Sequence, residues 1–349
     1  AVNWQQVMPE PAGLDAEIRA HLEAENAYTE AVMKPTEALR ERLFAEMKGR
    51  IKEDDSTAPS PDGPWAYYVS YVAGGQHPRY CRKARLLDGP ETILIDGNRE
   101  AEGRAFFHLS GLSHSPDHRY VAWGADDRGS ELHRIRIRDT ETGSDLDDVL
   151  SDTTGHAFWA ADGRTLFYGR LDDNHRPAEI HRHVLGTPQS DDVLVYREPD
   201  PGFFAGVGKT LSGRYIVINS HDHETSELHL IDAHDPAAPM RMIWPRRPGV
   251  EVSLDHQGDR FLFLTNEGGA EDFRIAWSPV EAPGPENWSE LVPHVPGRLI
   301  LGMEAFKDFL VRLERENGLP RIVVRERRSG AEHAIAFDEE AYSLGLGEA

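Results

Sequence analysis

A two-part phrase that recurs about every 48 residues constrains the fold of this chain more than any other feature. The first part is a turn followed by a strand-like run, as in "SPDHRYVAW", "AADGRTLFY", "TLSGRYIVI" and "HQGDRFLFL". The arginines of this part are separated by 45, 50 and 46 positions: Arg119, Arg164, Arg214 and Arg260. A nearly regular period of this length indicates one structural unit per phrase.

The second part of the phrase follows shortly after the first, as "SELHRIRIRD", "AEIHRHVLG", "SELHLIDAHD" and "AEDFRIAWS". Its acidic residues are separated by 48, 48 and 44 positions: Glu131, Glu179, Glu227 and Glu271. Weaker copies of both parts lie before and after these four, which makes six units between Trp65 and about Tyr342. Several short strands in each repeat of 40 to 50 residues are typical of a β-propeller blade. The absence of a 3.6-residue apolar stripe in these units argues against a stacked helical repeat.

The N-terminal region has a different pattern, because residues 14–52 predict two helices. Asp15 is a plausible N-cap, Pro35 ends the first helix, and Thr36 can cap the second. The second helix carries an i, i+4 apolar stripe of Leu39, Leu43, Met47 and Ile51. The acidic run Glu53–Asp55 and three prolines follow. We therefore expect a helical arm over residues 1–58 and an all-β propeller domain over residues 59–349.

Composition excludes several classes of function. The formal net charge is −22, from 60 acidic against 38 basic residues, and such a field repels nucleic acid. An acidic surface can also simply keep a large protein in solution. No apolar run approaches the ~20 residues of a membrane span, and the N-terminus lacks the features of a signal peptide. The single cysteine, Cys81, excludes an internal disulfide, and we expect it to be a buried, inert thiol in a cytoplasmic protein.

The 17 histidines raise the question of a metal site. His181 and His183 alternate along one segment, as do His221 and His223, the latter followed by Glu224. A zinc site needs a further ligand and a supporting shell, and the sequence nominates neither. We therefore expect exposed, solvated histidines, no metal and no cofactor.

Four aspartates fall in probable loops between strands: Asp126, Asp127, Asp172 and Asp173. They could line a rim or channel that attracts cationic peptides. They could equally form turns, since an aspartate side chain accepts hydrogen bonds from the backbone that follows it. We favour the turn interpretation for each residue and leave the collective field a modest role.

Two stretches carry a resemblance to a known family. "YTEAVMKPTEALRERLFAEMKGRIKEDDSTAP" and "EGRAFFHLSGLSHSPDHRYVAWGADDRGSEL" resemble the N-terminal part of the oligopeptidase B (protease II) group of the prolyl oligopeptidase family of serine peptidases. The similarity runs from about Asn3 to Leu346. It implies a seven-bladed propeller paired with an α/β-hydrolase domain that cleaves short peptides after Arg or Lys. It also implies that the arm packs on the hydrolase domain and that "GRIKEDDSTAP" is a crossing between the two.

The resemblance also indicates parts that this sequence does not contain. Family members carry a Gly-x-Ser-x-Gly elbow, and no serine here has glycine at both −2 and +2. Ser113 in "GLSHS" comes nearest and fails at the second glycine. The family's catalytic Asp and His follow the elbow, and a seventh blade would follow residue 349. We therefore expect a fragment without catalytic residues that has no peptidase activity alone, which leaves its assignment as an enzyme uncertain.

Glu131 is the one site residue that the resemblance nominates. An acidic residue at the matching position in the family faces the domain interface and can pair with an arginine of the hydrolase domain. Against this, Glu179, Glu227 and Glu271 share its place in the repeat, and a residue found in four blades can simply serve the blade. The role of Glu131 as a gate between the domains therefore rests on the resemblance alone.

Three functions compete. The first is a non-catalytic propeller that restricts entry of short basic peptides to the hydrolase domain. The second is a free-standing scaffold propeller, against which the apolar arm argues because its natural partner is another domain. The third, a propeller enzyme such as a glycosidase, would need paired carboxylates at a defined separation and ranks last. We also expect self-association through the arm or an open edge of the ring, or closure as a six-bladed ring.

Overall fold

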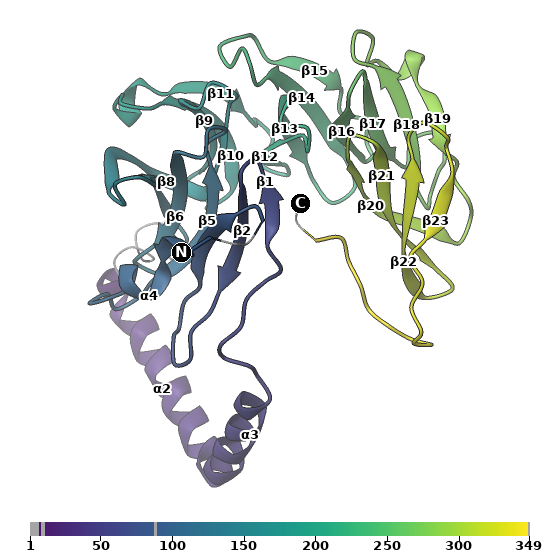
Figure 1. The fold of residues 1–349 in the computed structure, drawn as a ribbon. Helices are drawn as coiled ribbons and strands as arrows, with labels where there is room; N and C mark the ends of the chain where they lie inside the picture. Colours follow the sequence, from purple (N-terminus) through teal and green to yellow (C-terminus); the bar gives the residue numbers. More distant parts are fainter. Residues whose placement is uncertain (1–6, 8–10, 87–88, 348–349) are drawn as a thin grey trace.

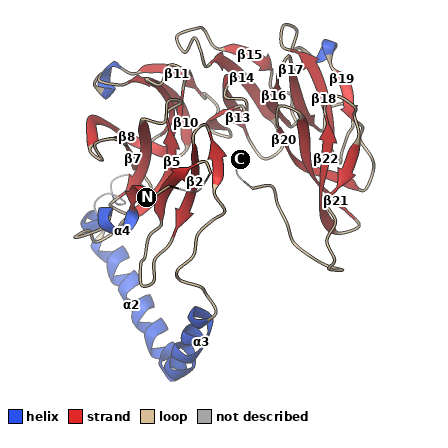
Figure 2. Cartoon of the chain, viewed as in Figure 1, coloured by secondary structure: helices blue, strands red, loops and turns tan. Residues whose placement is uncertain are grey.

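The computed structural model describes residue 7, residues 11–86 and residues 89–347. Its strands form blades arranged in an arc, and a helical arm projects from the first blade (Figures 1 and 2). The prediction of a β-propeller preceded by a helical arm is confirmed. None of the helices in the described residues is long and apolar enough to cross a lipid bilayer.

The arm consists of α2 (Ala16–Met33) and α3 (Glu37–Gly49), joined by the 3-10 turn η2 (Lys34–Thr36) and preceded by η1 (Pro11–Gly13). Asp15 caps α2 as expected, because its carboxylate accepts the amides of Glu17 and Ile18. Thr36 does precede α3, but the prediction that its side chain caps this helix was wrong. Its hydroxyl donates backward to the carbonyl of Met33 at 2.7 Å and makes no capping bond to α3.

The blades are antiparallel sheets whose strands pair in chain order. Blade 1 contains β1 (Ser60–Asp62), β2 (Trp65–Ser70), β3 (Arg79–Ala84) and β4 (Thr92–Asp96), and the short helix α4 (Gly97–Glu100) follows it. Blade 4 contains β12 (Phe204–Lys209), β13 (Tyr215–His221), β14 (Ser226–Asp232) and β15 (Arg241–Trp244). Blade 5 contains β16 (Val252–Gln257), β17 (Arg260–Thr265), β18 (Arg274–Pro279) and β19 (Ser289–Val292), with η4 (Pro285–Asn287) before its last strand. Blade 6 contains β20 (Arg298–Ala305), β21 (Phe309–Glu316), β22 (Leu319–Glu326) and β23 (Glu332–Ala334).

Blades 2 and 3 share one long strand and so form a seven-stranded sheet. Its strands are β5 (His108–His114), β6 (Tyr120–Asp126), β7 (His133–Asp139), β8 (Asp145–Trp159), β9 (Thr165–Leu171), β10 (Pro177–Val184) and β11 (Val193–Arg197), with η3 (Gln189–Asp191) before β11. The first half of β8 pairs with β7 and closes blade 2, whereas its second half pairs with β9 and opens blade 3. The strand reverses direction between Asp152 and Gly155, which both have positive φ.

The repeated phrase of the sequence corresponds to the inner hairpin of each blade. Arg119, Arg164 and Arg214 lie in the turn immediately before the second strand, and Arg260 begins the second strand of blade 5. The "SELHRIRIRD"-type phrase leads into the third strand. Each blade packs on the next through an apolar cluster, so the period of the sequence is the period of the core.

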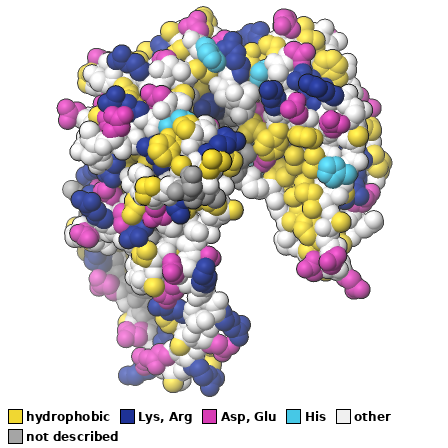
Figure 3. All heavy atoms as spheres, viewed as in Figure 1, with side chains coloured by type: hydrophobic (Ala, Val, Ile, Leu, Met, Phe, Trp, Pro, Cys, Tyr) yellow, Lys and Arg dark blue, Asp and Glu magenta, His cyan; other side chains and the backbone are white. Residues whose placement is uncertain are grey.

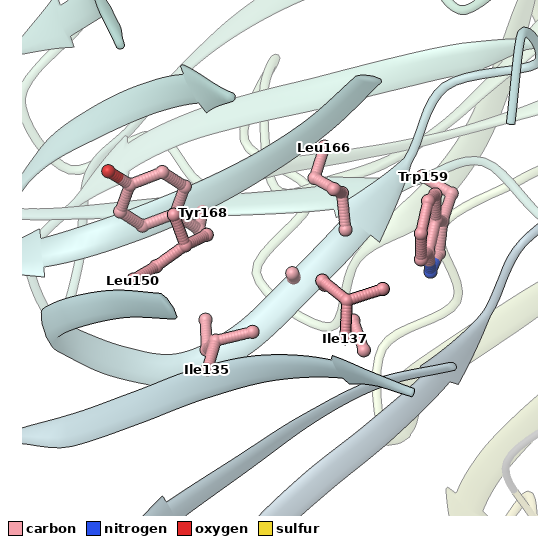
Figure 4. Close-up of a cluster of buried hydrophobic side chains, with 8 residues drawn as sticks. Ile135, Ile137, Leu150, Trp159, Leu166 and Tyr168 are labelled. Carbon is pink, nitrogen blue, oxygen red and sulfur yellow. The ribbon is translucent and has the colours of Figure 1, made fainter. Parts of the chain in front are cut away.

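The cluster between blades 2 and 3 shows how such a seam is built (Figure 4). Alternate residues of β7 point the same way, which places Ile135 and Ile137 against Trp159, Leu166 and Tyr168 across the bend of β8. All five side chains have at most 1% of their surface exposed. Burial of such side chains stabilises the seam by about 1.5–3 kcal/mol each.

The two ends of the arc do not meet. Blade 1 and blade 6 share no strand pairing among the described residues, and the segment after β23 runs back between them (Figure 1). Figure 3 shows a hollow between the half that carries the arm and the half formed by the last blades.

Candidate functional site

The arm enters the propeller at one end of the blades, which we call the arm face. Residues 53–57 run beside the end of β2, where the amide of Gly74 donates to Glu53 and the amide of Tyr71 donates to the carbonyl of Asp55. Because strands alternate in direction, every loop between a second and a third strand lies at this same end. The loops are residues 71–78, 127–132, 172–176, 222–225, 266–273 and 317–318.

The aspartates at the start of three of these loops build the turns. Asp126 accepts the amides of Arg128 and Gly129 with one carboxylate oxygen and that of Glu131 with the other. Asp172 and Asp222 bind two following amides each in the same manner. The turn interpretation is therefore confirmed for Asp126 and Asp172. Asp127 has another role, since it pairs with Arg104 at 2.8 Å and with Arg134 at 3.4 Å.

Glu131 lies in the arm-face loop of blade 2 with an exposed side chain and a φ of 61°. The backbone amide of Glu131 donates to the carboxylate of Asp126 at 2.8 Å, which fixes this uncommon conformation. Among the described residues its carboxylate makes no hydrogen bond and no ion pair. The residue thus presents a free negative charge from a rigid loop on the side of the arm.

The matching glutamates of blades 3 and 4 already have partners among the propeller's own residues. Glu179 contacts His181 at 2.8 Å and the guanidinium of Arg197 at 2.7 Å. Glu227 contacts His229 at 2.8 Å and the guanidinium of Arg246 at 3.5 Å. In these two blades the second phrase therefore contains a Glu-x-His segment whose glutamate bonds to its own histidine. Glu131 departs from this pattern because it precedes β7 instead of lying on it. Glu271, in the loop of blade 5, is also exposed and unpaired among the described residues.

A buried ionic network joins blades 3 and 4 on the arm face. Glu198, whose side chain is 1% exposed, accepts a hydrogen bond from Arg246 at 2.7 Å and others from Ser220 and Tyr196. Burial raises the pKa of Glu198, but the bonds from Arg246 and Ser220 outweigh it and lower the pKa to about 2. Arg246 in turn lies 3.7 Å above the ring of Phe203. This network fixes the arm-face ends of two neighbouring blades.

The expectation of exposed, solvated histidines was wrong for His181, whose side chain is 11% exposed and bound to Glu179, and for His183. The ring of His183 is fully buried between Asp192, at 2.7 Å from Nδ1, and Asp148, at 3.0 Å from Nε2. Burial alone would lower the pKa of His183, but the two carboxylates outweigh it and raise the pKa. The strand pattern concealed this clamp because Asp148 belongs to the preceding blade. In the part of the chain that the structure describes, no three His, Cys, Asp or Glu side chains converge as metal ligands would.

Two serines show what their hydroxyls do in this fold. Ser113 donates to the carbonyl of Ala157 at 2.7 Å and ties blade 2 to blade 3. Ser212 lies 2.8 Å from Nδ1 of His256, but it also bonds Thr210 and the amide of Arg214 within its turn. Cys81 is buried as expected, and burial raises the pKa of its thiol.

Comparison with known proteins gives a consistent result. The N-terminal β-propeller domain of prolyl oligopeptidases matches residues 10–348. Dipeptidyl aminopeptidase BI of Pseudoxanthomonas mexicana is 34% identical, and the match covers 95% of this chain and 48% of that protein. Protease 2 of Moraxella lacunata is 30% identical, with 95% and 48% covered.

Solved structures show the same likeness. Oligopeptidase B from Leishmania major superposes with a TM-score of 0.88 at 29% identity, covering 96% of this chain and 49% of that one. Oligopeptidase B from Trypanosoma brucei gives a TM-score of 0.86 at 28% identity, with 94% and 47% covered. The chain thus spans about half the length of the relatives it matches.

Proposed function

The chain belongs to the prolyl oligopeptidase family through its N-terminal β-propeller domain, and on that premise we propose that it controls access of short peptides to a separate α/β-hydrolase domain. Its relatives are about twice its length, which is consistent with a second domain of similar size. In this proposal the hydrolase domain, which supplies the acyl-transfer chemistry, covers the arm face and packs on the arm. The division into an arm over residues 1–58 and a propeller over residues 59–349 is part of the proposal.

The arm supports the position of the partner domain. Neither of its two main helices, α2 and α3, contains a buried residue. On α3 the side chains of Leu39, Leu43 and Met47 are between 44% and 66% exposed. Ile51, predicted as the fourth member of the stripe, lies beyond the end of α3 at Gly49 and is 67% exposed. A stripe of this kind is costly to leave in water and fits a helix that packs against another domain. A scaffold propeller without a partner domain would give the stripe no role.

The free carboxylate of Glu131 is the observation that carries the proposal of a gate. A rigid, unpaired negative charge on the arm face is suited to an ion pair with an arginine of the hydrolase domain when the two domains close. Its counterparts Glu179 and Glu227 cannot take this role, since their carboxylates are already bound within the blades. We infer that opening of this pair admits peptide and that its formation accompanies the closed, active arrangement.

The substrate class follows from charge and from the family. A net charge of −22 favours the approach of cationic peptides, and we propose short peptides with Arg or Lys at the cleaved position. A single, buried cysteine fits the reducing cytoplasm that we propose as the location.

The first test uses the chain alone. Incubation with a fluorogenic peptide that carries Arg, and in parallel with a serine-reactive fluorophosphonate, is expected to give neither hydrolysis nor labelling. Stoichiometric labelling with turnover would place a nucleophile in this chain and contradict the proposal. Binding partners other than a hydrolase domain, with no effect on a peptidase, would favour the scaffold alternative.

The second test addresses the gate in a protein that joins this chain to its hydrolase domain. Glu131→Gln is expected to lower kcat/KM about tenfold or more, and to weaken the dependence of the rate on ionic strength, because one charged pair is lost. The control Glu271→Gln removes the same charge from the same repeat position and should leave both unchanged. Equal effects of the two variants would show that only the collective field of the arm face matters.

A further inference from the structure

The third strand of blade 2 carries an arginine stripe that the proposed function does not use. In β7, Ile135 and Ile137 face the core shared with blade 3, so Arg134, Arg136 and Arg138 lie on the opposite face. That opposite face contains Trp123, which pairs with Arg136 across the strands and packs against Ile95 of blade 1. Among the described strands, β7 is the only one with three arginines. The stripe therefore lines the seam between blades 1 and 2.

Two of the three arginines are neutralised by carboxylates. Arg138 pairs with Asp145 at 2.7 Å and with Glu100 of α4 at 3.0 Å. Asp127 accepts Arg134 at 3.4 Å and also Arg104, which follows α4 in the chain, at 2.8 Å. The residues 97–104 that connect the two blades thus contribute both a carboxylate and a guanidinium to the seam.

Arg136 is the member left without a partner. Its guanidinium lies 5.4 Å from the ring centroid of Trp123, and it makes no hydrogen bond or ion pair with any described residue. Burial lowers the pKa of Arg136 and the cation Arg134 lowers it further, while the charges of Asp127 and Asp145 offset only part of this shift. With Arg104 the seam holds four guanidinium groups against three carboxylates, which leaves one positive charge in a strongly acidic protein.

We propose that this cluster, centred on Arg136 and flanked by Arg104 and Arg134, binds a small oxyanion of the carboxylate or phosphate type. A guanidinium presents parallel N–H donors that match two oxygens of such a group. The flat face of Trp123 holds Arg136 in place, so little side-chain freedom is lost when the anion binds. The bound anion would join β7 to the segment that follows α4 and stiffen the seam between the arm-bearing blade and the rest of the propeller.

The proposal is independent of the proposed gate, because it concerns the outer part of the seam and a different residue. It is tested on the chain itself, by calorimetric titration and thermal unfolding at constant ionic strength. The probes are inorganic phosphate, acetate and, as a non-forked anion, chloride. We expect saturable binding and a rise in melting temperature with phosphate or with acetate, but not with chloride. The probe that saturates identifies which oxyanion type the site takes.

Variants separate a site from a general effect of charge. Arg136→Gln is expected to weaken oxyanion binding about tenfold or more, and Arg136→Lys to restore only part of it, because lysine lacks the fork. The control Arg164→Gln removes the same charge from an exposed turn of blade 3 and should bind as the parent chain does. Melting of each variant without anion shows whether it is folded. Equal binding by the parent chain and Arg136→Gln, or an equal response to chloride, would overturn the proposal.

Discussion

Asp255 holds three consecutive blades together, and its removal should destabilise the propeller measurably. The carboxylate lies on β16, the innermost strand of blade 5, and its residue is 9% exposed. One oxygen accepts the amides of Leu211 in blade 4 and of His256, at 2.9 Å and 2.8 Å. The other oxygen accepts the amide of Ala305 in blade 6 at 3.0 Å. The three blades are separate sheets, and this carboxylate adds to the few backbone hydrogen bonds that join them, such as the one from the amide of Ile300 to the carbonyl of Asp272.

The size of the effect follows from the groups left without a partner. In Asp255→Ala three amides lose their acceptor, and those of His256 and Ala305 belong to buried residues. Each buried, unpaired donor costs about 1–3 kcal/mol, while the exposed Leu211 can turn to water. Burial also raises the pKa of Asp255, which shows that the buried charge is itself unfavourable. Its removal therefore offsets part of the stability lost with the three hydrogen bonds. We expect a net decrease of about 2–4 kcal/mol in the free energy of unfolding. Asp255→Asn keeps one acceptor oxygen, so its free energy of unfolding should lie between those of the parent chain and Asp255→Ala.

The assay is urea unfolding followed by tryptophan fluorescence, with native-state hydrogen exchange at the amides of His256 and Ala305. The control Asp259→Ala removes an 83% exposed carboxylate with a surface ion pair to Arg327, and should cost less than about 1 kcal/mol. Asp255→Ala should speed exchange at both amides well beyond the global change. If it unfolds at the same urea concentration as the control and keeps both amides protected, the reasoning about this carboxylate is refuted.

Three further predictions concern other parts of the molecule. His183→Gln should cost about 3 kcal/mol at pH 6, because Asp148 and Asp192 lose a buried cation. The pKa of His183 is raised in the folded state, so the stability difference between the parent chain and His183→Gln should be full below the unfolded-state pKa of about 6.5. It should shrink as the pH rises through the folded-state pKa. Denaturant melts from pH 5 to 9 test this, and a stability difference that grows with pH would contradict it. Gly155→Ala should destabilise by about 2 kcal/mol or more, since φ is 92° and the new Cβ would lie 2.7 Å from Cβ of Ser110; Gly186→Ala, with φ of 83° and open space, should cost about 1 kcal/mol in the same melts. The isolated chain should self-associate through its arm, and Leu43→Glu should lower the association measured by sedimentation; a concentration-independent monomer mass for the parent chain would count against this.

Residues at equivalent positions of the sequence repeat have different environments in the structure. Glu131, Glu179 and Glu227 were equivalent by spacing, yet two are bound to the histidine two residues on and one is free. Glu131 lies at a positive φ that its bond to the carboxylate of Asp126 stabilises, whereas Glu271, also unpaired among the described residues, has Phe273 where the bound glutamates have a histidine. A repeat in the sequence records which positions correspond, and it does not record such local departures.

His183 and Arg136 illustrate the other kind of departure. In the sequence each belongs to an alternating run, "HRHV" and "HRIRIRD", and alternation indicates only which side chains share a face. Whether a side chain on that face meets a carboxylate, as His183 does with Asp148 of the preceding blade, or stays unpaired, as Arg136 does, depends on residues distant in the sequence.

The sequence by itself determined the architecture: an arm with helical periodicity, then blades whose period of about 48 residues is carried by turns and alternating strands. These are local signals, since the chain within a few residues decides whether a helix, a turn or a strand forms. Only the tertiary structure decided how β8 bends to serve two blades, and which charges between blades are paired, buried or free. Those outcomes depend on contacts between residues tens of positions apart, and their energies are set by burial and by the partner, which spacing along the chain does not encode.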